Sequence, residues 1–152
     1  DSAGMIILIT AAGGAFGATL QAAQVGPAIQ ALVNTEDAST GLALLALAFG
    51  VSSLIKIAQG SSTVAMITTA GMLAAMLTDV ASLPYHRVYI ATAIAAGALV
   101  GTWMNDSGFW VFSKMGGVSE IETLKSWTPL SAIVGITAML TTVLLALVVP
   151  LR

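Results

Sequence analysis

The chain has 152 residues, of which 57% are hydrophobic and only 8% charged, and its formal net charge at pH 7 is -2. An average soluble domain is about 45 to 50% apolar and about 25% charged, so these residues cannot form a soluble surface, and we expect several membrane-embedded elements. The small net charge without any Lys/Arg cluster excludes nucleic-acid binding, and the absence of cysteine excludes disulfides and thiolate metal sites.

The first predicted element is a helix over residues 3–33 that is rich in small side chains. Gly13 and Gly17, four residues apart, would let a neighbouring helix approach closely. The polar stretch 34–40 is predicted to be the first loop.

A re-entrant helical hairpin is predicted over residues 41–78. Its 38 residues are more than one span of about 20 needs, and too few for two comfortable spans with a loop. The arms would cover 41–58 and 64–78, and the tip at 59–63 would lie at membrane depth. Non-helical backbone is tolerated there only if it is buried in protein or faces a wet cavity.

The tip of this hairpin reads Gln59-Gly60-Ser61-Ser62-Thr63. The N-terminal N–H groups of the second arm would face a bound anion there, and the three hydroxyl groups would add donors. That chemistry suits an anionic polyol. The alternative is that Ser61, Ser62 and Thr63 only cap the second arm, as such residues do in many helices.

A broken helix is predicted over residues 88–115, with the break at 105–108. An intramembrane carboxylate costs ~2.5 to 3.5 kcal/mol on insertion scales, so Asp106 in the break indicates a functional site. Trp103 and Trp110 flank the break. Because aromatic residues also mark membrane interfaces, a surface loop is the alternative interpretation.

The last two elements are predicted to be a surface helix and a plain membrane span. Residues 116–128 are polar, and Ser119 followed by Glu122 matches a capping box. Residues 129–149 are long enough for one crossing, with a structural role.

Two interrupted apolar segments rich in Ser, Thr, Asn and Gly are typical of the midplane site of a transporter. An intramembrane enzyme is disfavoured, because the chain has no His-Glu-x-x-His motif and Asp106 has no second intramembrane acid for a dyad. A channel or a non-transporting structural subunit could use the same packing glycines. Neither would need a Ser/Thr tip that faces an unwound helix.

Three stretches, 11–17, 59–65 and 105–110, closely resemble the gluconate permease family of proton symporters. The resemblance covers essentially the whole chain. Family members are much longer, and this chain opens on Asp1 with no signal peptide, so it resembles their C-terminal third.

The resemblance implies an all-α integral membrane fold, one half of an inverted-repeat carrier. Residues 41–78 would be the re-entrant hairpin of the second repeat and 88–115 its discontinuous helix. It also implies a multi-pass protein of the bacterial cytoplasmic membrane, with the lipid bilayer and a second copy of the chain as candidate partners. Dicarboxylate carriers of the wider group have Ser-Asn-Thr where this chain has Ser61-Ser62-Thr63, so a proton rather than sodium is the expected coupling ion.

The implied function is proton-coupled uptake of gluconate or a related small hydroxy-carboxylate, with no other cofactor. Glycerate, hydroxybutyrate and D-serine are the alternative substrates. The residues expected to bind the substrate are Gly60, Ser61, Ser62, Thr63, Asn105, Ser107 and Lys56.

Asp106 is the expected proton carrier, because a carboxylate in a poorly solvated cavity binds a proton more readily. A nearby Lys56 would oppose that tendency. The alternative for Lys56 is that its long stem lets the ammonium extend to a polar region.

Overall fold

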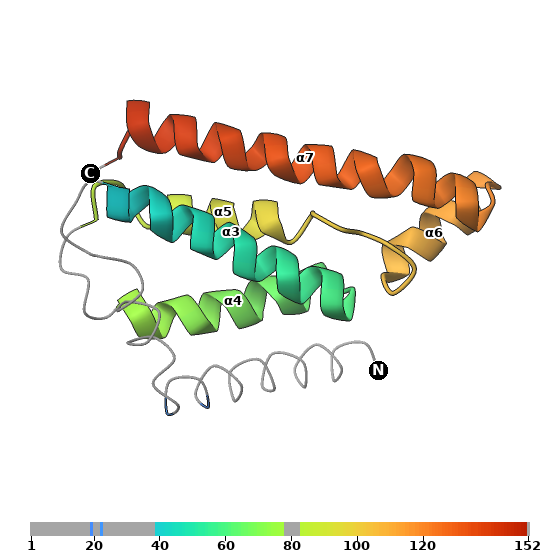
Figure 1. The fold of residues 1–152 in the computed structure, drawn as a ribbon, viewed down its shortest axis with the longest axis horizontal. Coiled ribbons are helices and arrows are strands. Elements are labelled where there is room, and N and C mark those ends of the chain that lie inside the picture. Colours follow the sequence, from blue (N-terminus) through green and yellow to red (C-terminus); the bar gives the residue numbers. More distant parts are fainter. Residues whose placement is uncertain (1–18, 20–21, 23–38, 78–82, 152) are drawn as a thin grey trace.

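The computed structural model of the chain describes residues 19, 22, 39–77 and 83–151. The helices in the two long stretches are α3 (Ser39–Gln59), α4 (Ser62–Leu77), α5 (Val88–Gly97), α6 (Ser107–Gly116) and α7 (Glu120–Val148) (Figure 1). No strand occurs among the described residues, which confirms the all-α prediction for them. The helix predicted over 3–33 lies outside the described residues, apart from positions 19 and 22.

Two of these helices, α3 and α7, are long and apolar enough to cross a membrane. At 1.5 Å per residue, the 21 residues of α3 extend about 31 Å and the 29 residues of α7 about 43 Å, against a hydrocarbon core of about 30 Å. Large apolar side chains on α7, such as Leu140 and Leu147, are more than 60% exposed. These features fit a membrane protein whose outer face contacts lipid.

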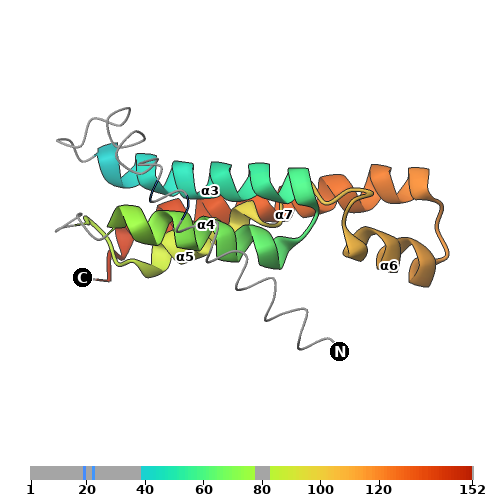
Figure 2. The same ribbon diagram turned by 90° about the horizontal axis from the view of Figure 1, so that it is seen from below.

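The helices pack through small residues. α5 lies between α3 and α7, and α4 runs back along α3 (Figures 1 and 2). A Cβ atom on Gly97 of α5 would lie 2.3 Å from the carbonyl oxygen of Phe49 in α3, and one on Gly135 of α7 would lie 2.7 Å from that of Ala96. The absence of side chains at these two glycines therefore lets three helix backbones come together.

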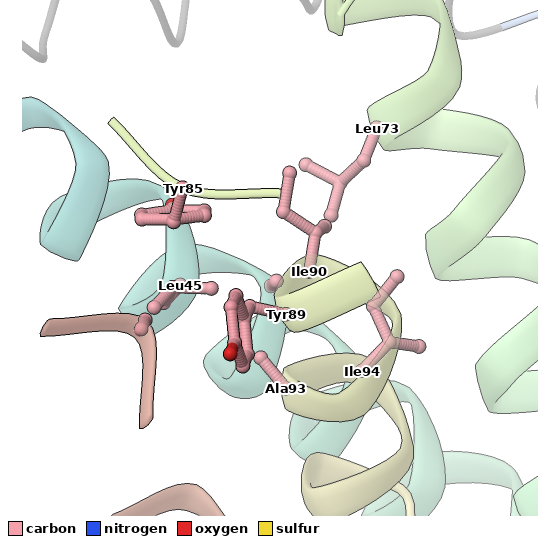
Figure 3. Close-up of a cluster of buried hydrophobic side chains, with 9 residues drawn as sticks. Leu45, Leu73, Tyr85, Tyr89, Ile90, Ala93 and Ile94 are labelled. Carbon is pink, nitrogen blue, oxygen red and sulfur yellow. The ribbon is translucent and has the colours of Figure 1, made fainter. Parts of the chain in front are cut away.

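The apolar core lies near the beginning of α3, away from its turn into α4 (Figure 3). Its buried members are Leu45, Ala48, Leu73, Tyr85, Tyr89, Ile90, Ala93, Ile94 and Ala146. Both tyrosines also bind backbone: the hydroxyl of Tyr85 donates to the carbonyl of Gly41, and that of Tyr89 to the carbonyl of Val149 at 2.5 Å. These contacts fix the starts of α3 and α5 and the end of α7 at one end of the bundle.

The hairpin differs from its predicted boundaries. Only Gly60 and Ser61 lie outside helix between α3 and α4, whereas the predicted tip was 59–63. With so short a link, residues 39–77 hold helices of 21 and 16 residues. α3 alone is long enough for a full crossing, whereas α4 is shorter than the roughly 20 residues that a span needs, so the re-entrant hairpin stays a prediction.

The broken helix also differs, because its break begins earlier than predicted. α5 ends at Gly97 and α6 begins at Ser107, so the break covers 98–106 rather than 105–108. Within the break, Gly101 has a φ of 77°, which lies outside the helical region, and a Cβ there would lie 2.3 Å from Cγ1 of Ile57. Ser107 belongs to the first turn of α6.

The final helix begins before its predicted start at 129. Ser119 and Glu122 form the predicted capping box, so α7 begins at Glu120 and the surface helix and the span are one element. Pro129 lies inside this continuous helix. The polar first turns of α7 therefore continue into its apolar part instead of forming a separate helix.

Candidate functional site

Lys56 is the most unusual side chain of the described part, because it is charged and has no exposed surface. It lies in the last turn of α3, an apolar helix that contains no other charged residue. Its Nζ donates to the carbonyl of Gly60 at 2.9 Å and forms an ion pair with Asp106. The ammonium therefore does not extend to solvent, and the polar groups that it reaches are a carbonyl and a carboxylate of this chain. A buried charge of this kind is tolerated only when it is paired.

Asp106 supplies the opposite charge and also begins α6. Its backbone is extended, with φ -99° and ψ 132°, as is usual for an N-cap residue. Its Oδ1 accepts a hydrogen bond from the backbone N–H of Gly108 at 2.5 Å, while Oδ2 faces Lys56. Asp106 is 8% exposed, so one buried residue both caps a helix and neutralises a lysine.

The break also satisfies the end of α3. The last carbonyl groups of a helix have no partner within it. Here the carbonyl of Ile57 accepts from Nε1 of Trp103 at 3.0 Å and from Nδ2 of Asn105 at 2.9 Å. The segment between α5 and α6 thus holds the C-terminal turn of α3 through two side chains.

Gly60 brings the hairpin tip directly against the break. Its φ is 79°, and a Cβ there would lie only 2.2 Å from the carbonyl oxygen of Asn105. Its N–H donates to the carbonyl of Lys56 at 2.8 Å, which closes the end of α3. Only glycine combines this backbone conformation with so close an approach.

The hydroxyl residues of the tip take different positions. Oγ of Ser61 accepts from the N–H of Val64 at 3.3 Å, the contact expected of a helix cap. Oγ of Ser62 donates to the carbonyl of Ala98 at 2.9 Å and joins α4 to the start of the break. Thr63 and Ser107 are exposed. Ser61 therefore acts as a helix cap, while Ser62 links α4 to the break.

The structure thus brings together five of the predicted site residues: Lys56, Gly60, Ser62, Asn105 and Asp106. Sequence reasoning missed Trp103 as a hydrogen-bond donor to α3, having considered it only as an interface marker. It also missed the carbonyl of Ile57 as the shared acceptor. An indole next to a predicted break was the available signal, since the last carbonyl groups of a helix need donors from outside it.

A family model described as GntP family permease matches residues 1–148 of the chain. The chain is 38% identical over 141 residues to the inner membrane permease YgbN of Escherichia coli (strain K12), a match that covers 93% of this chain and 30% of that protein. It is 36% identical over 134 residues to a low-affinity gluconate transporter of the same strain, covering 88% and 29%.

A third relative of the same strain, a Gnt-II system L-idonate transporter, is 35% identical over 136 residues, covering 90% of this chain and 29% of the transporter. The chain therefore spans less than a third of the length of the relatives that it matches. No solved structure matches it.

The close contact at Gly60 predicts a specific loss of stability. Gly60→Ala should lower the midpoint of thermal unfolding of the purified protein in detergent more than Gly117→Ala does. Gly117 also has a positive φ, 64°, but a Cβ there meets nothing within 4 Å. The control carries only the backbone strain, whereas Gly60→Ala adds an overpacking cost of typically about 1 to 3 kcal/mol. Equal losses in the two variants would contradict the tight contact with Asn105.

The buried ion pair predicts strong coupling between its two members. Lys56→Met or Asp106→Asn alone should destabilise the protein by about 3 to 5 kcal/mol, because each leaves a buried charge unpaired. The double variant should recover most of that loss, since Asn retains the capping oxygen. Denaturant unfolding gives the free energy of unfolding of the wild type, the two single variants and the double variant.

Lys114 and Glu120 provide the matched control for this cycle, because their ion pair is 3.2 Å long but exposed. Lys114→Met should change stability far less than Lys56→Met. Additive losses in the Lys56 and Asp106 double variant would show that the buried pair does not exist in solution.

Proposed function

The chain belongs to the GntP family of permeases, and from this premise we propose that it is the C-terminal part of a proton-coupled carrier for gluconate or a related small hydroxy-carboxylate. The family and the relatives are permeases and transporters rather than enzymes, and two long apolar helices fit a membrane location. Two relatives are named as transporters of gluconate and of L-idonate, which are both anionic sugar acids. These names support a sugar acid over glycerate, hydroxybutyrate or D-serine.

The observation that carries the proposal is the buried Lys56–Asp106 pair where the hairpin tip meets the break. A carrier of a carboxylate needs a cation that is sheltered from water, and Lys56 supplies one. A proton-coupled carrier also needs a group that alternates between charged and neutral forms, and Asp106 is an acid in the same place. A purely structural subunit would need neither group.

We assign the remaining contacts from their positions around this pair. The substrate carboxylate would be bound by Lys56, by N–H groups at the start of α4, and by the hydroxyls of Ser61 and Thr63. Asn105 and Ser107, on the other side of the contact, would bind hydroxyl groups of the sugar acid. Thr63, Asn105 and Ser107 are the exposed side chains of this set, which supports their access to a substrate.

The proposed topology places the α3–α4 link and the break inside the membrane region, as a re-entrant hairpin against a discontinuous helix. The buried charges at their contact support this placement, because charged groups within membrane segments face the protein interior or a water-filled cavity. Carriers built from inverted repeats form their site between two such halves. This chain would supply one half, within a multi-pass protein of the cytoplasmic membrane.

The test of the proposed function is uptake of labelled gluconate by membrane vesicles that contain the full-length protein. An imposed pH gradient, acidic outside, should drive accumulation that a protonophore abolishes. Unlabelled L-idonate should compete, and glycerate, hydroxybutyrate and D-serine should compete less. Vesicles with residues 1–152 alone should not accumulate gluconate, because half of the site would be missing. Uptake that survives the protonophore, or no uptake at all, would contradict the proposal.

The hydroxyl contacts predict a graded effect on affinity. Thr63→Ala and Ser61→Ala should each raise the gluconate concentration that gives half-maximal uptake. The reason is that a lost hydrogen bond to a charged group is worth about 1.5 to 3 kcal/mol. Thr128→Ala is a matched control, because its hydroxyl donates to the carbonyl of Thr102 at 2.7 Å and serves the helix contact instead. Unchanged half-saturation in both tip variants, at normal protein levels, would reduce these hydroxyls to helix caps.

A further inference from the structure

Lys56 and Asp106 form an isolated pair within the described residues. α4 has no ionisable side chain. The ionisable side chain of α5 is Tyr89, near the helix start and away from the break, and its hydroxyl donates to the carbonyl of Val149. On α6 and α7 the charged side chains are Lys114, Glu120, Glu122 and Lys125, all near the far end of α6 and the start of α7. Lys114 pairs with Glu120 there. A change in the charge of Asp106 therefore acts first on Lys56.

We propose that Lys56 exchanges one carboxylate for another during transport, an inference that rests on the proposed carrier function. In the empty site its ammonium pairs with Asp106. When Asp106 takes up a proton, Lys56 loses this partner and binds the carboxylate of the substrate in its place. Proton and sugar acid then enter the same site as a linked pair.

The charge of the buried site explains why the two would be linked. The empty site holds one positive and one negative charge, and the loaded site holds the same, because protonated Asp106 is neutral and the substrate brings the negative charge. Binding the proton alone would leave Lys56 uncompensated, and binding the anion alone would leave an excess carboxylate. Either form buries a net charge, which costs several kcal/mol. Only the empty site and the fully loaded site carry no net charge, and only these two forms are suited to switch the site from one side of the membrane to the other.

The two oxygens of Asp106 are arranged for this exchange. Oδ1 accepts a hydrogen bond from the N–H of Gly108 and needs a free lone pair for it, whereas Oδ2 faces Lys56. The proton from the aqueous phase would therefore reside on Oδ2. Asp106 can become neutral in this way and still cap α6, so protonation changes the partner of Lys56 without unwinding the helix.

The second contact of Lys56 keeps it in position when Asp106 is neutral. Its Nζ donates to the carbonyl of Gly60 at 2.9 Å, within the same hairpin. This bond does not depend on the charge of Asp106. The ammonium thus remains beside the start of α4, where the substrate carboxylate is proposed to bind.

The experiment is direct binding of labelled gluconate to the purified full-length protein between pH 5 and 8. Wild-type affinity should rise as the pH falls, approaching about tenfold per pH unit where Asp106 is ionised in the free protein, since each anion then brings one proton. Asp106→Asn should bind with high affinity that does not vary with pH. Lys56→Met should bind weakly at every pH, and Lys56→Arg should restore part of the affinity.

The outcomes separate this inference from the proposed function. If the wild-type protein binds no gluconate at any pH, the carrier proposal fails. If it binds and transports gluconate but Asp106→Asn keeps the wild-type pH dependence, or Lys56→Met keeps wild-type affinity, the exchange of partners is overturned. Lys114→Met should retain the wild-type profile, because its charge belongs to the exposed pair. Should Asp106→Asn not fold, Asp106→Glu must keep the pH dependence, and a flat profile in it would also overturn the inference.

Discussion

The need to neutralise one buried ammonium governs how the parts of this chain meet. Lys56 lies in the last turn of an apolar helix and has no exposed surface, so its ammonium needs an acidic partner close by. Asp106 does so only because α5 stops at Gly97 and the chain continues unwound past Ile57. The break is thus the route by which the carboxylate reaches the end of α3. The glycines at the contact are what allow so close an approach.

The type of most elements could be predicted from the sequence, but only some of their ends could. The Asn-Asp-Ser-Gly cluster indicated the start of α6, and the Ser119–Glu122 capping box is local chemistry that the structure confirms. The course of the break depends instead on Gly101, whose positive φ lets the chain pass close to Ile57, a residue distant in sequence. A contact of that kind leaves no periodic signal. The re-entrant topology stays a proposal, since α3 is long enough to cross.

The candidate site shows the same division. Lys56 and Asp106 each stood out as a charge in an apolar segment, but 50 residues separate them, and no local pattern predicts that they pair. Ser61 could be read either as a cap or as a ligand from its sequence. Its bond to the N–H of Val64 supports the cap without excluding a second acceptor or donor. The substrate and proton roles of all these residues stay predictions.

The central claim is that Lys56 holds the tip to the break in the empty site and changes partner when the site is loaded. The most direct measurement is a structure of the full-length protein with gluconate bound, at a resolution that places the Lys56 side chain. We expect Nζ of Lys56 to contact the gluconate carboxylate, with Asp106 still capping α6 but no longer paired. An intact Lys56–Asp106 pair, with gluconate bound elsewhere, would contradict the account.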